Sequence, residues 1–245
     1  RPFQGVDGRF RSGVSIDEIV SLYEFDRRLR LLCLDGLERV EVALRSAIIN
    51  KIAVDHGPHF YYDENLFDRK ESVTELRVFA QKADHLSIKH YRTKYTDPHL
   101  PPIWCLTEAS NFGQTTRIFA DLNKSERRKI AENFSLDEGI CVSWFRSLTS
   151  LRNSCAHHTR LWNFRFEVNK PKKAKKYKGE LADNASLYAR ISVLVIILRS
   201  CDPFGFREWI EHLKVRIDSK PEIASLDAMG FPSDWSIRPI WLSHP

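Results

Sequence analysis

Residues 151–163 gather the side chains of this chain that are best suited to chemistry. The stretch reads LRNSCAHHTRLWN and holds two arginines, two asparagines and two adjacent histidines. An imidazole with its ordinary pKa of about 6.5 can give or take a proton at neutral pH, and a guanidinium can hold an anionic group in a bidentate grip. The stretch is therefore a candidate catalytic constellation. The alternative is the polar end of an ordinary helix, because cations near a helix C-terminus suit its dipole.

A helical wheel sorts these residues into two faces. At about 100° per residue, four of them fall on one polar arc of roughly 140°. The four are Arg152, Asn153, His157 and Arg160. His158 falls beside an apolar arc, so we expect it to be half-buried and structural. The apolar arc comprises Trp144, Leu148, Leu151, Cys155 and Trp162. If the helix extends through the stretch, the polar side chains converge above one face.

The sequence around the stretch has a helical period almost throughout, with glycine and proline at the ends of the periodic segments. We expect helices over residues 16–54, 70–95, 103–122, 125–134, 185–201 and 206–217, and one that starts at 135 and ends in the stretch above. Capping boxes at Ser15 and Ser135, and a cap at Asn184, mark three of the starts. The sequence FRFEV at 164–168 suggests a short extended piece, and the Trp-rich tail at 229–245 is expected to pack back onto the body.

Length and composition are those of an ordinary globular protein. The 245 residues are 42% hydrophobic, which is enough for a real core, and they predict a single all-α domain over residues 1–245. No apolar run approaches the roughly 20 residues that a membrane-spanning helix needs. The longest run, Ile191–Leu198, is expected to be a buried helix segment. The net charge of +6 permits an anionic partner without requiring one.

The cysteines and histidines argue against a metal site. Five cysteines, an odd number without a C-x-x-C pair, disfavour a disulfide framework and a structural zinc site. They fit a reducing, cytosolic setting. Cys155 and His158 alone cannot complete a zinc shell. No H-E-x-x-H motif, glycine-rich phosphate loop or nucleophile elbow occurs either.

The pattern Arg152-Asn153-x-x-Ala156-His157 resembles the R-x4-6-H motif of the HEPN superfamily of helical ribonucleases. Together with further blocks along the chain, the whole stretch closely resembles the Abi-like (AbiD/AbiF-type) bacterial abortive-infection proteins. The further blocks are RPFQ at 1–4, LYEFDRRLRLL at 22–32, GLERVEVALRS at 36–46, PPIWCLTEASNFG at 101–113 and MGFPSDW at 229–235. In that family RPFQ usually follows an N-terminal helical segment, which we expect to be missing from this chain.

The resemblance implies a fold, an activity and roles for individual residues. The fold would be a HEPN-like helical bundle with additional helices. The activity would be metal-independent RNA cleavage in phage defence, in which a 2′-OH attacks the neighbouring phosphorus and leaves a 2′,3′-cyclic phosphate. His157 would be the general acid or base, and Arg152 would hold the phosphate. Asn153 would orient one of these partners, and Arg160 would add a phosphate contact.

The resemblance also implies the setting in which the chain would act. It requires no metal or other cofactor, and it places the protein in the bacterial cytoplasm. One motif supplies one histidine, whereas in-line cleavage benefits from both an acid and a base. A homodimer with two motifs facing one cleft is therefore implied, with RNA as substrate or bound partner.

Two acidic residues on the long first helix could support such a site. Glu38 and Glu41 are three residues apart, and they could pair with Arg152 and fix its rotamer. The alternative, which we favour from the sequence, is local pairing with Arg39 or Arg45.

Six lysines among residues 170–178 follow the motif closely. Lys172, Lys173, Lys175 and Lys176 could bind the RNA backbone, with an affinity that falls as salt rises. A solvated surface loop explains the same composition equally well.

Three functions stay open from the sequence. The chain could be an RNA-cleaving effector of phage defence, a HEPN module that binds RNA without cutting it, or a helical scaffold for another protein. The pair Arg152 and His157 favours the first, because a pure binder has no need of a proton-transfer residue.

Overall fold

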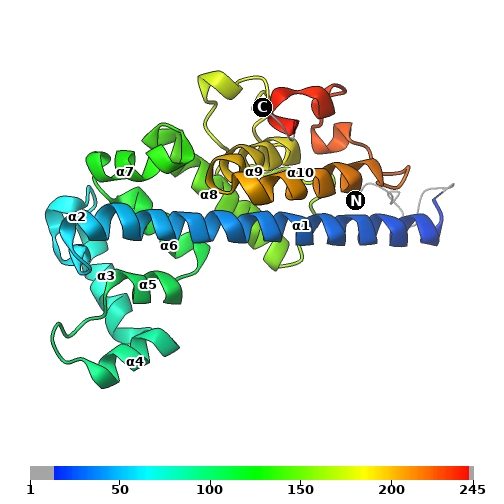
Figure 1. Ribbon diagram of the computed structural model, residues 1–245. Helices are drawn as coiled ribbons and strands as arrows, with labels where there is room; N and C mark the ends of the chain where they lie inside the picture. The colour runs from blue at the N-terminus through cyan, green and yellow to red at the C-terminus, as the bar shows by residue number, and fades with distance from the viewer. Residues whose placement is uncertain (1–13, 243–245) are drawn as a thin grey trace.

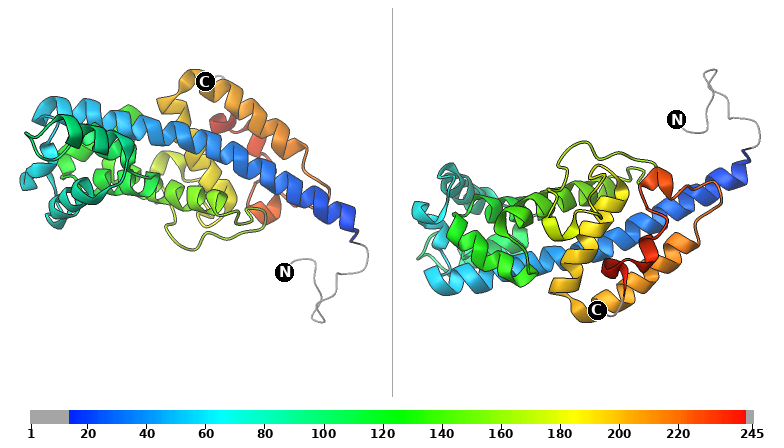
Figure 2. Two further views of the ribbon diagram at one scale, coloured as in Figure 1. Left: turned by 90° about the horizontal axis from the view of Figure 1, so that it is seen from below. Right: turned by 90° about the horizontal axis from the view of Figure 1, so that it is seen from above.

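The longest helix, α1, runs almost the full length of the molecule (Figures 1 and 2). The computed structural model describes residues 14–242, so the RPFQ block lies outside the described residues. Helix α1 spans Ile16–Ile48 and begins with the predicted capping box between Ser15 and Glu18. The chain continues to turn through a π-helical segment, Ile49–Ala53, and α2, Val54–His56. The helix predicted for residues 16–54 is therefore confirmed.

Helices make up most of the remaining structure. They are α3 (Glu71–Lys82), α4 (Leu86–Lys94), α5 (Ile103–Ala109), α6 (Phe112–Asp121), α7 (Lys124–Ala131), α8 (Glu138–Ala156), α9 (Leu187–Cys201) and α10 (Pro203–Asp218). Short 3-10 turns connect several of them. Over residues 14–242 the only β-type pairing is an isolated bridge between Phe67 and Leu122. The predicted all-α class is confirmed, and the extent of one domain over residues 1–245 stays a prediction.

Two of the predicted helices are each split in two. The segment 70–95 breaks between α3 and α4, where His85 is extended and its side chain accepts from the Ser87 N–H. The segment 103–122 breaks between α5 and α6, where Asn111 forms a reciprocal capping box with Gln114. Both predictions were wrong for the same reason, because the apolar period continues across the break while a side chain caps a new helix.

Two predicted caps were also wrong. Ser135 has a left-handed backbone, with φ of 53°, and Asp137 caps α8 instead by accepting from the Gly139 N–H. Ser186, not Asn184, caps α9. Residues 164–168 form no paired strand, and the Phe166 and Val168 carbonyls accept from a buried arginine. The short extended piece expected there stays a prediction.

The core forms where α8, α9 and α10 pack against α1, with α6 on the α8 side. Helix α9 is buried along nearly all of its length, as its run of apolar residues predicted. The Trp-rich tail packs onto its first turn, where Trp241 donates from Nε1 to the Tyr188 hydroxyl at 3.2 Å. The predicted packing of the tail is confirmed. Within residues 14–242, no helix is both long and apolar enough to cross a membrane.

Arg190 on α9 fixes the loop that follows the histidine stretch. Its side chain is fully buried, and it donates to the carbonyls of Phe166, Val168 and Asn169 and to the Ser147 hydroxyl. Burial without a carboxylate partner lowers the pKa of Arg190 to about 10. These bonds hold the loop against α8, because the buried guanidinium needs acceptors and the loop carbonyls supply them.

Candidate active site

Helix α8 ends inside the histidine stretch, about two turns before Asn163, through which the helical wheel extended it. Ala156 is its last residue, and His158 takes a left-handed conformation with φ of 55°. The Thr159 N–H donates to the Ser154 carbonyl at 2.8 Å, and the His158 N–H donates to the Cys155 carbonyl at 3.2 Å. This pair of bonds is a Schellman motif, which closes a helix by satisfying its last carbonyls. Residues beyond 157 therefore leave the helical face on which the sequence analysis placed them.

Three of the predicted site residues lie together at this end of α8. The Arg152 side chain is partly buried, and its Nη1 donates to Asn153 Oδ1 at 3.4 Å. Asn153 and His157 are exposed and lie four residues apart, hence on the same helical face. Within the described part of the chain, the His157 imidazole makes no hydrogen bond or ion pair. Its two ring nitrogens are therefore open to a ligand.

His158 does not have the half-buried, structural position that we expected. Its side chain is exposed, because the left-handed turn at this residue directs the chain away from the apolar arc. Its contribution is to the backbone, since it occupies the position after a helix end where glycine and asparagine are preferred. The prediction of a buried imidazole was wrong.

Arg160 lies beyond the turn and not on the helical face. Its guanidinium lies over the Trp162 ring, 5.6 Å from the ring centroid. Its Nη2 donates to the Asn163 carbonyl at 3.5 Å. The side chain is exposed and follows His157 closely in the sequence, so it can still reach a ligand from a different direction than Arg152.

A buried carboxylate on α1 fixes the backbone of this segment. Asp26 Oδ1 accepts the Leu161 N–H at 2.9 Å and the Trp162 N–H at 2.7 Å, and its other oxygen pairs with Arg30. Burial raises the pKa of Asp26, although the Trp162 N–H, the charges of Arg30 and Arg160 and the Leu161 N–H oppose the shift. The turn that presents His157 is therefore fixed to a residue more than a hundred positions earlier. No local pattern in the sequence marks Asp26 as part of the site.

Of the two acidic residues on α1, Glu41 follows the local alternative and Glu38 does not. Glu41 forms an ion pair with Arg45, one turn further along α1. Burial raises the pKa of Glu41, while the charges of Arg45 and Arg152 oppose the rise. Arg152 therefore lies within electrostatic reach of Glu41 without an ion pair to it. Glu38 is exposed and makes no ion pair with any residue between 14 and 242.

The four predicted lysines are exposed but lie at the other end of α8. The Lys172 N–H donates to the Ser143 hydroxyl, and the Lys172 carbonyl accepts from Trp144 Nε1, both at 2.9 Å. Ser143 precedes His157 by fourteen residues, which is about 21 Å along a helix. The structure therefore does not bring Lys172, Lys173, Lys175 or Lys176 into the site around His157.

Two thiols pack beneath the motif. Cys33 on α1 and Cys155 on α8 are both buried, and contact with Cys155 together with burial raises the pKa of the Cys33 thiol. The five cysteines are free thiols. Cys33 and Cys155 join the two helices through apolar packing next to the site.

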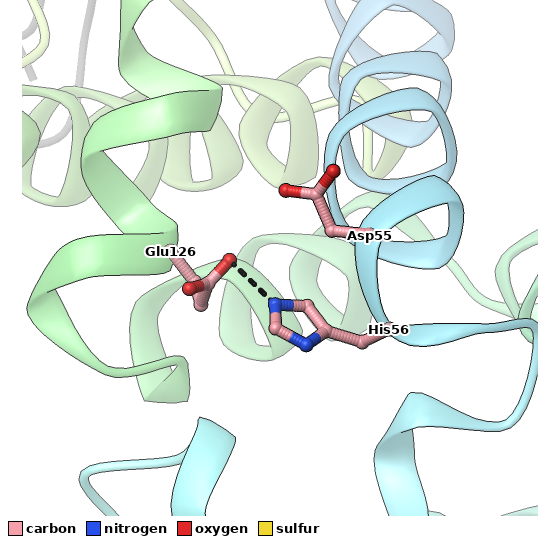
Figure 3. A group of neighbouring side chains, drawn as sticks. All are labelled: Asp55, His56 and Glu126. Carbon is pink, nitrogen blue, oxygen red and sulfur yellow. Dashed lines mark ion pairs between the residues drawn. The ribbon is translucent and has the colours of Figure 1, made fainter.

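A second polar group lies at the far end of α1, where Asp55, His56 and Glu126 come together (Figure 3). His56 Nε2 lies 3.3 Å from Glu126 Oε2. The Lys129 ammonium contacts Asp55 at 2.7 Å and Glu126 at 3.0 Å, so it already supplies a cation to the two carboxylates. Its hydrogen bond lowers the pKa of Asp55. We interpret this group as an ion-pair network that joins α2 to α7.

A family model described as Abi-like protein matches residues 1–163 of the 245. The chain belongs to the Abi-like family. No curated protein and no solved structure matches it. The matched region includes α1, α8 and the whole stretch that carries Arg152 and His157, so the Abi-like resemblance noted from the sequence is confirmed. Membership suggests a role in abortive infection, a form of phage defence.

The left-handed residue after α8 predicts a stabilising substitution. Replacing His158 by glycine removes the Cβ strain of a positive φ, and we expect the unfolding free energy to rise by about 0.5–1 kcal/mol in urea denaturation. His157→Gly is the matched control, because φ at His157 is −92°. That control should bring no gain. A loss of stability in His158→Gly would contradict the assigned turn.

The Asp26 interaction predicts a destabilising substitution. Asp26→Asn keeps an acceptor for the two N–H groups but leaves Arg30 as a buried, unpaired charge. We expect a loss of about 3 kcal/mol or more in urea denaturation. Asp35→Asn on the same helix removes only a surface ion pair with Arg39, and we expect it to change stability by about 0.5 kcal/mol or less. Equal effects of the two substitutions would show that Asp26 has no special role.

Proposed function

We propose that this Abi-like chain is a metal-independent endoribonuclease that acts as an effector of phage defence, with Arg152, Asn153 and His157 as its site. The observation that carries the proposal is the exposed end of α8. There the His157 imidazole has no protein partner among the described residues, and the Arg152 guanidinium donates to Asn153, which shares the helical face of His157. An exposed imidazole next to a partly buried guanidinium is an arrangement that a phosphodiester fits.

The proposed chemistry is an internal transfer at phosphorus. The ribose 2′-oxygen bonds to the neighbouring phosphorus, the bond from phosphorus to the 5′-oxygen breaks, and the products are a 2′,3′-cyclic phosphate and a free 5′-OH. The 2′-OH loses a proton to a base, and the departing 5′-oxygen gains one from an acid. His157 takes one of these roles. Arg152 stabilises the charge that grows on the non-bridging oxygens, and Asn153 holds Arg152 in place.

A homodimer would supply the second imidazole. Helix α1 carries exposed apolar side chains at Val20, Leu31 and Val42, with 55%, 53% and 56% of their surface accessible. They recur every eleven residues, which is close to three full helical turns, so they form one line along α1. Exposed apolar stripes of this kind favour burial against another protein. Glu41, whose pKa burial raises and the charge of Arg152 lowers, comes one residue before Val42, and its side chain is turned by about 100° from this line. A second copy seated on the line would therefore lie beside the site.

The cleavage proposal predicts the behaviour of a double variant. In the presence of EDTA, the parent should cut RNA and leave 2′,3′-cyclic phosphate ends, whereas Arg152→Ala/His157→Ala should lose activity by about 100-fold or more. His158→Ala is the matched control and should cut like the parent. The exposed His158 side chain belongs to the left-handed turn after α8 and not to the helical face that carries Asn153 and His157. If the double variant still cuts RNA, the catalytic site does not lie at the end of α8.

The dimer proposal predicts a change in mass. Leu31→Asp places a charge in the middle of the apolar line, and light scattering after gel filtration should show a shift from dimer to monomer together with a loss of cleavage. Val215→Asp on α10 is the matched control, because Val215 is 64% accessible and lies off this line. A parent that is monomeric at all concentrations, or a Leu31→Asp protein that remains dimeric, would contradict the use of this face.

A further inference from the structure

A groove of about 430 Å³ opens between α6 and α8, away from the end of α8 that carries His157. Its walls include Arg117 on α6 and Arg146 on α8, with Arg69 and Asn169 at its rim. The Asn169 side chain donates to the Ser150 hydroxyl on α8 at 2.9 Å. The Asn169 carbonyl accepts from buried Arg190. The loop side of the groove is therefore fixed by the core.

The groove is electrostatically positive. Its lining contains three arginines and one carboxylate, Asp121. Arg69 and Arg117 share Asp121 and the neighbouring Glu75 as ion-pair partners. Arg146 is exposed and makes no ion pair with any residue in the described range 14–242. It is therefore the arginine of the lining whose charge is available to a ligand.

Arg146 lies on the same face of α8 as the proposed site. Residues 146, 150, 153 and 157 are spaced by four, three and four, which places Arg146, Ser150, Asn153 and His157 in one row. Arg146 precedes His157 by eleven residues, or about 16 Å along the helix axis. A stacked strand that advances about 3.4 Å per nucleotide covers that distance in roughly five nucleotides.

The lysine segment, residues 170–178, contacts α8 one turn before this row begins. Ser143 lies one turn before Arg146, and its hydroxyl accepts from the Lys172 N–H. The lysines that the structure separates from His157 therefore lie just beyond the groove, at the end of the row. Positive charge follows α8 from its C-terminal end, past Arg146, to Lys172 and Lys173.

We propose that this groove binds the phosphodiester backbone of single-stranded RNA several nucleotides from the cleaved bond, with Arg146 as its principal phosphate contact. The proposal rests on the RNA-directed function above and adds a second binding site to it. A groove with two arginines in ion pairs and one available guanidinium suits an RNA backbone. A contact to phosphate requires a positive charge at the right position and does not depend on the identity of the base. Helix α8 then sets the distance between the binding contact and the chemistry.

Fluorescence anisotropy with the full chain tests the groove. The probe is a labelled 12-nucleotide RNA of randomised sequence, titrated at several salt concentrations against the parent, Arg146→Ala and Arg146→Glu. We expect Arg146→Ala to weaken binding about fivefold and to reduce the slope of log K against log salt by about 0.7, the value for one phosphate contact on a single strand. Arg146→Glu should bind more weakly still.

Arg207→Ala is the control variant. Arg207 is an exposed arginine on α10, which packs on α1 and α9 rather than on α6, and it makes no ion pair in the described structure. It should bind like the parent. Thermal melting of each variant checks that the fold is kept. Equal RNA binding by Arg146→Ala and Arg207→Ala would contradict the proposal that the groove binds RNA.

The same titration in a His157→Ala background, together with a cleavage assay of the parent, separates this proposal from the cleavage proposal. If the parent binds RNA through Arg146 but never cuts it, the cleavage proposal is refuted and the groove proposal is supported. If the parent cuts RNA but substitution of Arg146 does not change RNA binding, only the groove proposal is refuted. A parent that binds no RNA refutes both.

Discussion

The interaction between Asp26 and the amides of Leu161 and Trp162 determines how the site is presented. A buried carboxylate needs donors, and here it receives two backbone N–H groups and the Arg30 guanidinium. That requirement fixes the chain after α8 to the N-terminal half of α1. Without it, the turn at His158 would have only its own two helix-end bonds to hold it. The exposed position of His157 thus follows from a constraint in the core.

Helix α8 has two functions in this account. Its apolar face is buried against α1 and α6, and small thiols at Cys33 and Cys155 let the helices pack closely at the site. Its polar face carries Arg146 at one point and His157 at another, at a separation that the helix itself fixes. Arg190 holds the loop after the motif against the same helix. Rigid support on both sides is what a site for a charged, flexible substrate requires.

Local signals in the sequence predicted some elements correctly and failed at others. The Ser15 capping box and the apolar run of α9 were predicted correctly, whereas the caps expected at Ser135 and Asn184 lie at Asp137 and Ser186. The same capping signature at Asn111 was missed because a continuous apolar period concealed it. The contact of Asp26 with residue 161 joins segments far apart in the chain, so no periodicity could show it. The left-handed turn at His158 lacks the glycine that usually marks such a position.

The central claim is that RNA phosphate binds at His157, and NMR of the adjacent histidines tests it most directly. The imidazole signals, assigned with His157→Ala and His158→Ala, would be followed while a 12-nucleotide 2′-O-methyl RNA is added, because this RNA lacks the attacking hydroxyl and stays intact. The account predicts that the His157 ring signals shift with saturation while those of His158 move far less. Binding of the RNA with His157 unmoved, or with the larger shift at His158, would contradict it.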